Sequence, residues 1–258
     1  MVTTTGSGPA VVLLDQPREP LVVHRPPGQD ADGAAARPWV IMLHAPGENR
    51  TGNNYWQAQA ATALAAAGLT AVRFDLSGYG ESLDEKDPAA WARQVNDAIA
   101  TAREHGADPV HVVARGLHAA LLADAGAGAE VGTGGLRIAL FPPSGADLRW
   151  WSRDRASGVI EIGSPLDASE RAFWEACGAE PDLVRGLRVP AAAVDGLVGR
   201  LRDGVAWDVA VVAGRDRGPA ANTLVCGREP LTRLESDRRG LEYLLVRYLR
   251  MPSTEVRR

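Results

Sequence analysis

The 258-residue chain has few cysteines and no concentration of charge of one sign. Its two cysteines, Cys177 and Cys226, are too few for the disulfide framework of a small secreted protein. A formal net charge of -4 without a basic stripe argues against nucleic-acid binding. No apolar run reaches the length of about 18 residues that marks a membrane span, and the first residues, MVTTTGSGPAVVLLD, lack the regions of a signal peptide. We therefore expect a cytoplasmic protein with no membrane span and no nucleic-acid partner.

The motifs that hold metals and nucleotide cofactors are also missing. The sequence has no HxE, HExxH or CxxC spacing, so the usual ligand sets for zinc are absent. It has no GxxxxGK[ST] loop, and no GxGxxG motif opens a predicted helix. We expect neither a metal nor a cofactor.

What the chain does contain is an alternation of apolar strands and amphipathic helices. Hydrophobic residues make up 45% and charged residues 23%, which is typical of a globular domain. The alternation predicts an α/β protein with a mostly parallel sheet and helices on both faces. The predicted strands are 20–24, 39–44, 69–74, 110–113 and 136–141. The predicted helices are 53–68, 87–106, 117–126 and 237–249, the first with an asparagine cap and the second with Asp87 as its cap.

The regular alternation stops after residue 143. We expect a single domain over 1–258 with a cap inserted at about 143–206, over the ends of the strands. The last strand candidates, 207–214 and 222–227, are separated by too few residues for a usual parallel crossover. They are therefore predicted to form an antiparallel hairpin, unless one of them is a loop.

Three motifs stand where ligands bind in such sheets, beyond the carboxyl ends of the strands. They read VIMLHAPGENRTGNNYW, AVRFDLSGYGES and VHVVARGLHAALLA, over residues 40–56, 71–82 and 110–123. In order and spacing they resemble the α/β-hydrolases, which have an oxyanion loop that begins with histidine, a DxxGxGxS turn and a GxSxG nucleophile elbow. The resemblance implies an α/β-hydrolase fold, and it is close over about 38–142 and loose elsewhere.

The catalytic residues that the resemblance would imply are not all present. Aligned without gaps, Gly116 stands in the place of the nucleophile, and glycine has no side chain to form a covalent intermediate. A shift of two residues, with Gly116 as the first glycine of the motif, would put His118 there instead. The family places its histidine after the nucleophile and the acid, yet no histidine follows His118. Arg228 and Asp216 stand where the histidine and the acid are expected, and a guanidinium does not deprotonate at neutral pH.

The chain therefore resembles a degenerate branch of the α/β-hydrolases without the nucleophile. It is similar to the hydrolase-like proteins associated with the exosortase system, and to the atypical group that contains the bottromycin aspartate epimerase. Both resemblances imply a small-molecule or peptide ligand under the cap. Ordinary serine hydrolase activity is not expected.

Three hypotheses for the function follow. The first is a non-hydrolytic isomerase or epimerase of natural-product biosynthesis, with a substrate group, His44 or His118 as the base. The second is a non-catalytic ligand-binding or accessory protein, and the third is an unorthodox esterase. The oxyanion-type N–H groups and one cap aromatic give the predicted ligand-binding residues. These are Ala45, Gly116, Leu117 and Trp150.

Overall fold

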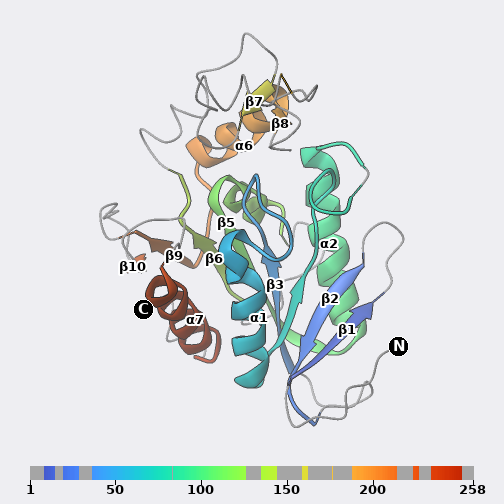
Figure 1. The fold of residues 1–258 in the computed structure, drawn as a ribbon, viewed down its shortest axis with the longest axis vertical. Coiled ribbons are helices and arrows are strands. Elements are labelled where there is room, and N and C mark those ends of the chain that lie inside the picture. Colours follow the sequence, from blue (N-terminus) through green and yellow to red (C-terminus); the bar gives the residue numbers. More distant parts are fainter. Residues whose placement is uncertain are drawn as a thin grey trace.

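A sheet of eight strands runs through the described part of the chain (Figure 1). In this computed structural model the described residues are 9–14, 20–28, 37–82, 84–125, 135–143, 159–161, 176, 188–213, 223–226 and 234–251. In spatial order the strands are β1 (Ala10–Leu14), β2 (Leu21–Arg25), β4 (Thr70–Arg73), β3 (Arg37–Leu43), β5 (Ala107–Arg115), β6 (Arg137–Leu140), β9 (Val209–Val212) and β10 (Thr223–Val225).

The sheet is mostly parallel. β1 pairs with β2 and β2 with β4 in antiparallel fashion, whereas all pairings from β4 to β10 are parallel. The parallel strands therefore end at one common edge, which we call the carboxyl edge of the sheet. The loops that follow β3, β4, β5 and β6 meet there.

Helices cover both faces of the sheet, as the sequence predicted. One face carries α1 (Trp56–Ala66) and α7 (Glu235–Leu249), which pack against each other (Figure 1). The opposite face carries α2 (Pro88–Glu104), the 3-10 helix η2 (Gly116–Ala123) and α6 (Ala191–Asp203). A short 3-10 helix, η1 (Asn53–Tyr55), precedes α1. Two further strands, β7 (Val159–Glu161) and β8 (Arg188–Pro190), pair in antiparallel fashion apart from the main sheet.

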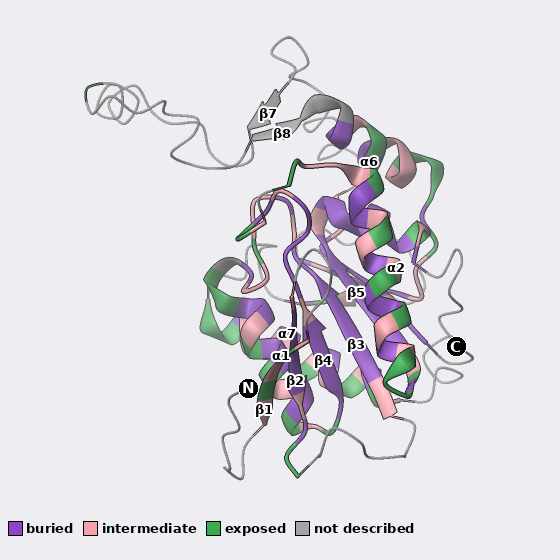
Figure 2. Cartoon of the chain, turned by 90° about the vertical axis from the view of Figure 1, so that its right-hand side faces the viewer, coloured by how far each residue is buried: buried purple, intermediate pink, exposed green. Residues whose placement is uncertain are grey.

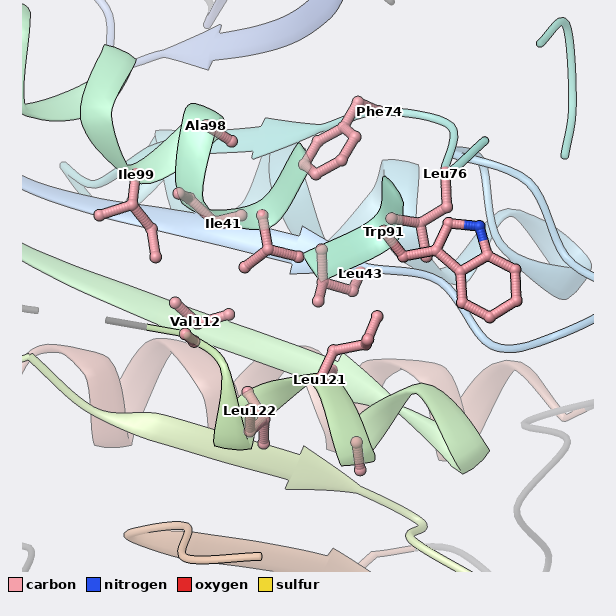
Figure 3. Packing of buried hydrophobic residues seen from close by; sticks show 14 of the residues in the cluster. Ile41, Leu43, Phe74, Leu76, Trp91, Ala98, Ile99, Val112, Leu121 and Leu122 are labelled. Atoms are coloured by element: carbon pink, nitrogen blue, oxygen red, sulfur yellow. The ribbon is translucent and has the colours of Figure 1, made fainter. Parts of the chain in front are cut away.

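An apolar core lies on each face of the sheet, and the central strands are buried along most of their length (Figure 2). On the α2 face, Ile41 and Leu43 of β3 belong to the same apolar cluster as Trp91 of α2 and Leu121 of η2 (Figure 3). Continuous apolar runs such as the one in β3 are typical of strands that are covered on both faces. This packing fixes where the strands end, and so fixes the loops at the carboxyl edge.

Two predictions about single elements were wrong, and a third element is confirmed as a helix but differs in type. No asparagine caps α1: its N-cap residue is Tyr55, in a left-handed conformation without a side-chain hydrogen bond. The predicted helix at 117–126 is a 3-10 helix that begins at Gly116. β9 and β10 pair in parallel, not as an antiparallel hairpin. Because β9 has four residues and β10 three, and a strand rises about 3.3 Å per residue, the distance that a parallel connection must span here is short.

The cap is described only in part. Residues 144–158 and 162–175 lie outside the described residues, and so does Trp150. α6 packs on η2 and α2, with Arg200 of α6 paired to Asp124 just after η2. β1 is the outermost strand on one side of the sheet, and its residues Val11 and Leu13 are 50% and 63% exposed. None of the helices in the described ranges combines the length and apolarity that a bilayer crossing needs.

Capping by Asp87 offers a test of the α2 assignment. Its carboxylate accepts hydrogen bonds from the N–H groups of Ala89 and Ala90 at 2.9 and 3.1 Å, ahead of Pro88 at the first helical position. We expect Asp87→Ala to lower the free energy of unfolding by about 1 kcal/mol, because these N–H groups lose their acceptor. Urea unfolding measures the change. Asp97→Ala, an exposed position within the same helix, is the matched control and should change stability by less than about 0.5 kcal/mol.

Candidate functional site

Gly116 occupies a sharp turn between β5 and η2, at the carboxyl edge. Its φ of +60° lies in the left-handed region, directly after the extended Arg115. A Cβ built at Gly116 would lie 3.2 Å from Ala45 Cβ and 3.9 Å from Pro46 Cδ. A side chain at this position would therefore point at the loop after β3. In the ungapped alignment this is the position of the nucleophile, and that assignment stays a prediction.

His44 directly follows β3 and is fully buried. Its Nε2 accepts a hydrogen bond from the Leu76 N–H at 3.1 Å, and its Nδ1 lies 2.9 Å from the Ala45 carbonyl oxygen. An acceptor at Nε2 and a donor at Nδ1 define the neutral tautomer that carries its proton on Nδ1. Both ring nitrogens are thus engaged with the backbone. His44 joins the loop after β3 to the turn after β4.

His118 lies behind the same loop and is also fully buried. Its Nδ1–H donates to the His44 carbonyl oxygen at 2.7 Å. The ring lies among three aromatic rings, with centroids 5.5 Å from His44, 5.4 Å from Tyr79 and 5.0 Å from Trp91. Its Nε2 has no hydrogen-bond partner among the described residues. The structure thus brings the two predicted histidines together, as parts of the core.

Both imidazoles are held in the neutral form. Burial lowers the pKa of His44, against the opposing effects of the Ala45 carbonyl and the carboxylates of Glu48 and Asp75. Burial also lowers the pKa of His118 well below 6.5, and the neighbouring His44 lowers it further. A base that must accept a proton from a ligand needs an accessible lone pair. In this conformation, neither ring presents one to the carboxyl edge.

A buried ion pair lies on the other side of Gly116. Glu48 Oε1 lies 3.4 Å from a terminal nitrogen of Arg115, and the two side chains are 8% and 3% exposed. Glu48 Oε2 accepts hydrogen bonds from the Ala45 N–H and from Trp56 Nε1–H, each at 3.1 Å. The Ala45 N–H, which the sequence suggested as an oxyanion donor, is therefore already bonded to a carboxylate of the chain itself.

Aromatic rings enclose the guanidinium of Arg115. Its central carbon lies 4.9 Å from the Trp56 ring centroid and 5.6 Å from that of Phe141. Phe141 directly follows β6 and has a φ of +49°, which is strained for a residue with a bulky side chain. Burial lowers the pKa of Arg115, while Glu48 raises it. The positive charge of Arg115 thus lies at the carboxyl edge, over the rings of Trp56 and Phe141.

A second ion pair fixes the turn after β4. Asp75 accepts hydrogen bonds from the Arg50 backbone N–H and from its guanidinium, both at 2.6 Å. Arg50 also pairs with Glu81 at 2.5 Å. Gly80 has a φ of +57°, and a Cβ there would collide with the Asp75 carboxylate. The DxxGxGxS motif is thus a turn whose carboxylate holds the loop after β3.

The predicted site residues fall into three groups. Gly116 and Ala45 face each other at the carboxyl edge, and Leu117 is buried at the start of η2. His44 and His118 are in the core, while Trp150, Asp216 and Arg228 lie outside the described residues. Sequence reasoning missed Glu48 and Arg115. The available signal was a pair of opposite charges at the ends of two strands that were predicted to be parallel neighbours.

Comparison with known proteins supports the fold but gives no family. No model of a known protein family matches the sequence, and no curated protein matches it. A soluble variant of monoglyceride lipase from Saccharomyces cerevisiae has TM-score 0.56 and 11% identity over 96% of each chain. The mouse α/β-hydrolase domain-containing protein 10 has TM-score 0.57 and 13% identity, over 93% of this chain and 98% of its own. Monoacylglycerol lipase of Paleococcus ferrophilus has TM-score 0.52 and 14% identity, over 83% and 95%.

The chain has an α/β-hydrolase fold. The fold predicted from the three motifs is confirmed by the strand order and by these matches. Structural matches with sequence identities below 25% are evidence for the fold and not for the activity, because one fold supports many functions. What the site does must therefore be argued from its own residues.

The buried histidines predict acid sensitivity. Burial lowers the pKa of His24, with a further effect from Arg73, and that of His111, each to about 4. The unfolded chain, with histidines near 6.5, binds more protons between these values, so stability is present above pH 6.5 and is lost as the pH falls towards 4. We expect each such histidine to remove up to about 2 kcal/mol between pH 6.5 and 5.

Urea unfolding at pH 7, 6 and 5 measures this loss. His111→Asn keeps an acceptor for the Leu136 N–H, which bonds to His111 Nδ1 at 3.1 Å, and removes the titrating ring. This variant should show a shallower dependence of unfolding free energy on pH. A stability that does not change from pH 7 to 5 would contradict the assignment of neutral buried imidazoles.

Proposed function

We propose that the protein is a non-hydrolytic member of this fold that binds a small molecule or peptide at the carboxyl edge, beside Gly116. The observation that carries the proposal is the contact between the Ala45 N–H and Glu48, next to a turn that has no side chain. An acyl-transfer site needs a nucleophile and free N–H donors for the oxyanion. Here the first is missing and one candidate donor is occupied.

The rest of the loop after β3 supports the same conclusion. Pro46 has no N–H group, and the Glu48 N–H donates to the Ala45 carbonyl at 3.0 Å. Hydrolysis would require these groups to rearrange, in addition to a new nucleophile and a base. Ligand binding needs neither a nucleophile nor a base, and ligands of parallel α/β sheets bind beyond the carboxyl ends of the strands.

The isomerase hypothesis is weakened for a histidine base. His44 has both nitrogens bonded to the backbone, and the Nε2 of His118 lies among aromatic rings behind the loop. A base contributed by the ligand itself is the remaining route to epimerisation. A hydrogen-exchange experiment distinguishes this route from binding without catalysis. A ligand that raises the melting temperature is incubated with the protein in D₂O. Protein-dependent exchange of a carbon-bound hydrogen would identify an isomerase.

The decisive experiment for hydrolysis compares the wild type with Gly116→Ser. We expect neither protein to turn over p-nitrophenyl esters or to be labelled by a fluorophosphonate. The new serine would face Ala45 and Pro46 without an established base, and the Ala45 N–H would remain bonded to Glu48. Phosphonate-sensitive turnover by the wild type would overturn the proposal, because it requires a nucleophile elsewhere.

Gly68→Ser is the matched control for this experiment. Gly68 also has a positive φ, +93°, but a Cβ there meets nothing within 4 Å, and it follows α1 at the opposite end of the sheet. Both variants should lose about 1–2 kcal/mol of stability from left-handed strain. Only Gly116→Ser should alter the binding of a ligand that stabilises the wild type. Equal effects of the two variants on binding would contradict the placement of the site.

A further inference from the structure

The charged pair beside Gly116 has the donors of a carboxylate-binding site. Two N–H groups, from Ala45 and Trp56, converge on one oxygen of Glu48 at 3.1 Å each. The guanidinium of Arg115 lies 3.4 Å from the other oxygen. Two donors to one oxygen and a cation beside the other form an arrangement that binds a carboxylate group. The carboxylate can belong to this chain or to a ligand.

Glu48 is a loose partner for Arg115. Charge-assisted N–H···O contacts usually measure about 2.7–2.9 Å, and arginine usually holds a carboxylate through two parallel bonds. The contact here is 3.4 Å long. Glu48 is tethered to a turn, in which its own N–H bonds back to the Ala45 carbonyl at 3.0 Å. A carboxylate without that tether is free to approach the guanidinium more closely.

Stability alone does not explain the pair. Replacing a buried ion pair by well-packed apolar residues is often neutral or stabilising. Here the guanidinium is also held between Trp56 and Phe141, and Phe141 takes up a strained backbone to lie there. Strain of this kind tends to collect at binding sites. The position, next to Gly116 at the carboxyl edge, is where a ligand is expected.

The two partners differ in how firmly they are placed. Arg115 belongs to β5, whose neighbours on both sides fix its backbone. Glu48 belongs to a surface turn, and the next residue, Asn49, is exposed. Of the two side chains, that of Glu48 is therefore the less firmly placed.

We propose that the Arg115 guanidinium and the N–H groups of Ala45 and Trp56 form a carboxylate-binding site, which Glu48 fills in this structure and a carboxylate of the ligand fills in the complex. The inference rests on the proposed binding function and names the chemical class of the ligand. The carboxylate is that of a small acid or of a peptide C-terminus.

The first test removes the internal occupant. Glu48→Ala removes the carboxylate that accepts from the Ala45 and Trp56 N–H groups, so acetate should raise its melting temperature in a saturable way at constant ionic strength. Acetamide, of the same shape without charge, should not. The wild type and Glu85→Ala, an exposed glutamate in the turn before α2, should not respond to acetate. The double variant Glu48→Ala/Arg115→Met should lose the response. Equal behaviour of Glu48→Ala and the wild type in acetate would overturn the proposal.

The second test uses the wild-type protein and does not depend on the folding of a variant. N-acetyl-leucine is compared with N-acetyl-leucinamide, and the tripeptide Ala-Ala-Leu with its C-terminal amide. At least one acid should bind on the order of tenfold more tightly than its amide, since the amide forfeits the charge-assisted bond. A preference in the first pair indicates a small acid, and one in the second pair a peptide C-terminus. If neither acid is preferred, displacement of Glu48 is wrong.

The two proposals fail separately. If the protein does not prefer carboxylates, the expected absence of ester turnover and of phosphonate labelling is not affected. Only the proposed ligand class is then wrong. Phosphonate-sensitive hydrolysis by the wild type would remove the proposed function, whatever acetate does to Glu48→Ala.

Discussion

The hydrogen bond from His118 Nδ1–H to the His44 carbonyl is the contact on which the carboxyl edge depends. It joins the turn after β5 to the end of β3, and His44 Nε2 then takes up the Leu76 N–H after β4. Three strand ends are thus tied by two neutral rings. Protonation of either ring would replace an acceptor by a donor and would put a charge among Tyr79 and Trp91, at a high cost in desolvation.

Gly116 lies between two different environments. On the α2 face are the neutral imidazoles and aromatic rings around His118, and on the α1 face is the charged pair of Arg115 with Glu48. The first holds the backbone and offers nothing to a ligand. The second concentrates a cation and directed N–H groups in a place of low polarity, where an electrostatic contact is strong. The asymmetry makes the proposed ligand binding independent of a side chain at Gly116.

The sequence predicted the fold because its signals were local. The apolar runs of β3 and β5, and the Asp87 cap of α2, are each decided within a few residues. The site was less predictable, because a side chain's role depends on neighbours far along the chain. His118 looked like a ligand-facing group until its partner, the His44 carbonyl, was known. Glu48 and Arg115, which are distant in sequence, gain their meaning only from the pairing of β3 with β5.

Among the described strands, β1 is the outermost on its side of the sheet, which affects how the protein behaves at high concentration. β1 is apolar along its whole length, pairs with β2 on one side, and presents Val11 and Leu13 to solvent. Exposed apolar edge strands are templates for pairing with another chain, and natural proteins commonly protect them with charge or proline. Within its described residues β1 has neither, so we expect self-association at high concentration to begin at this strand.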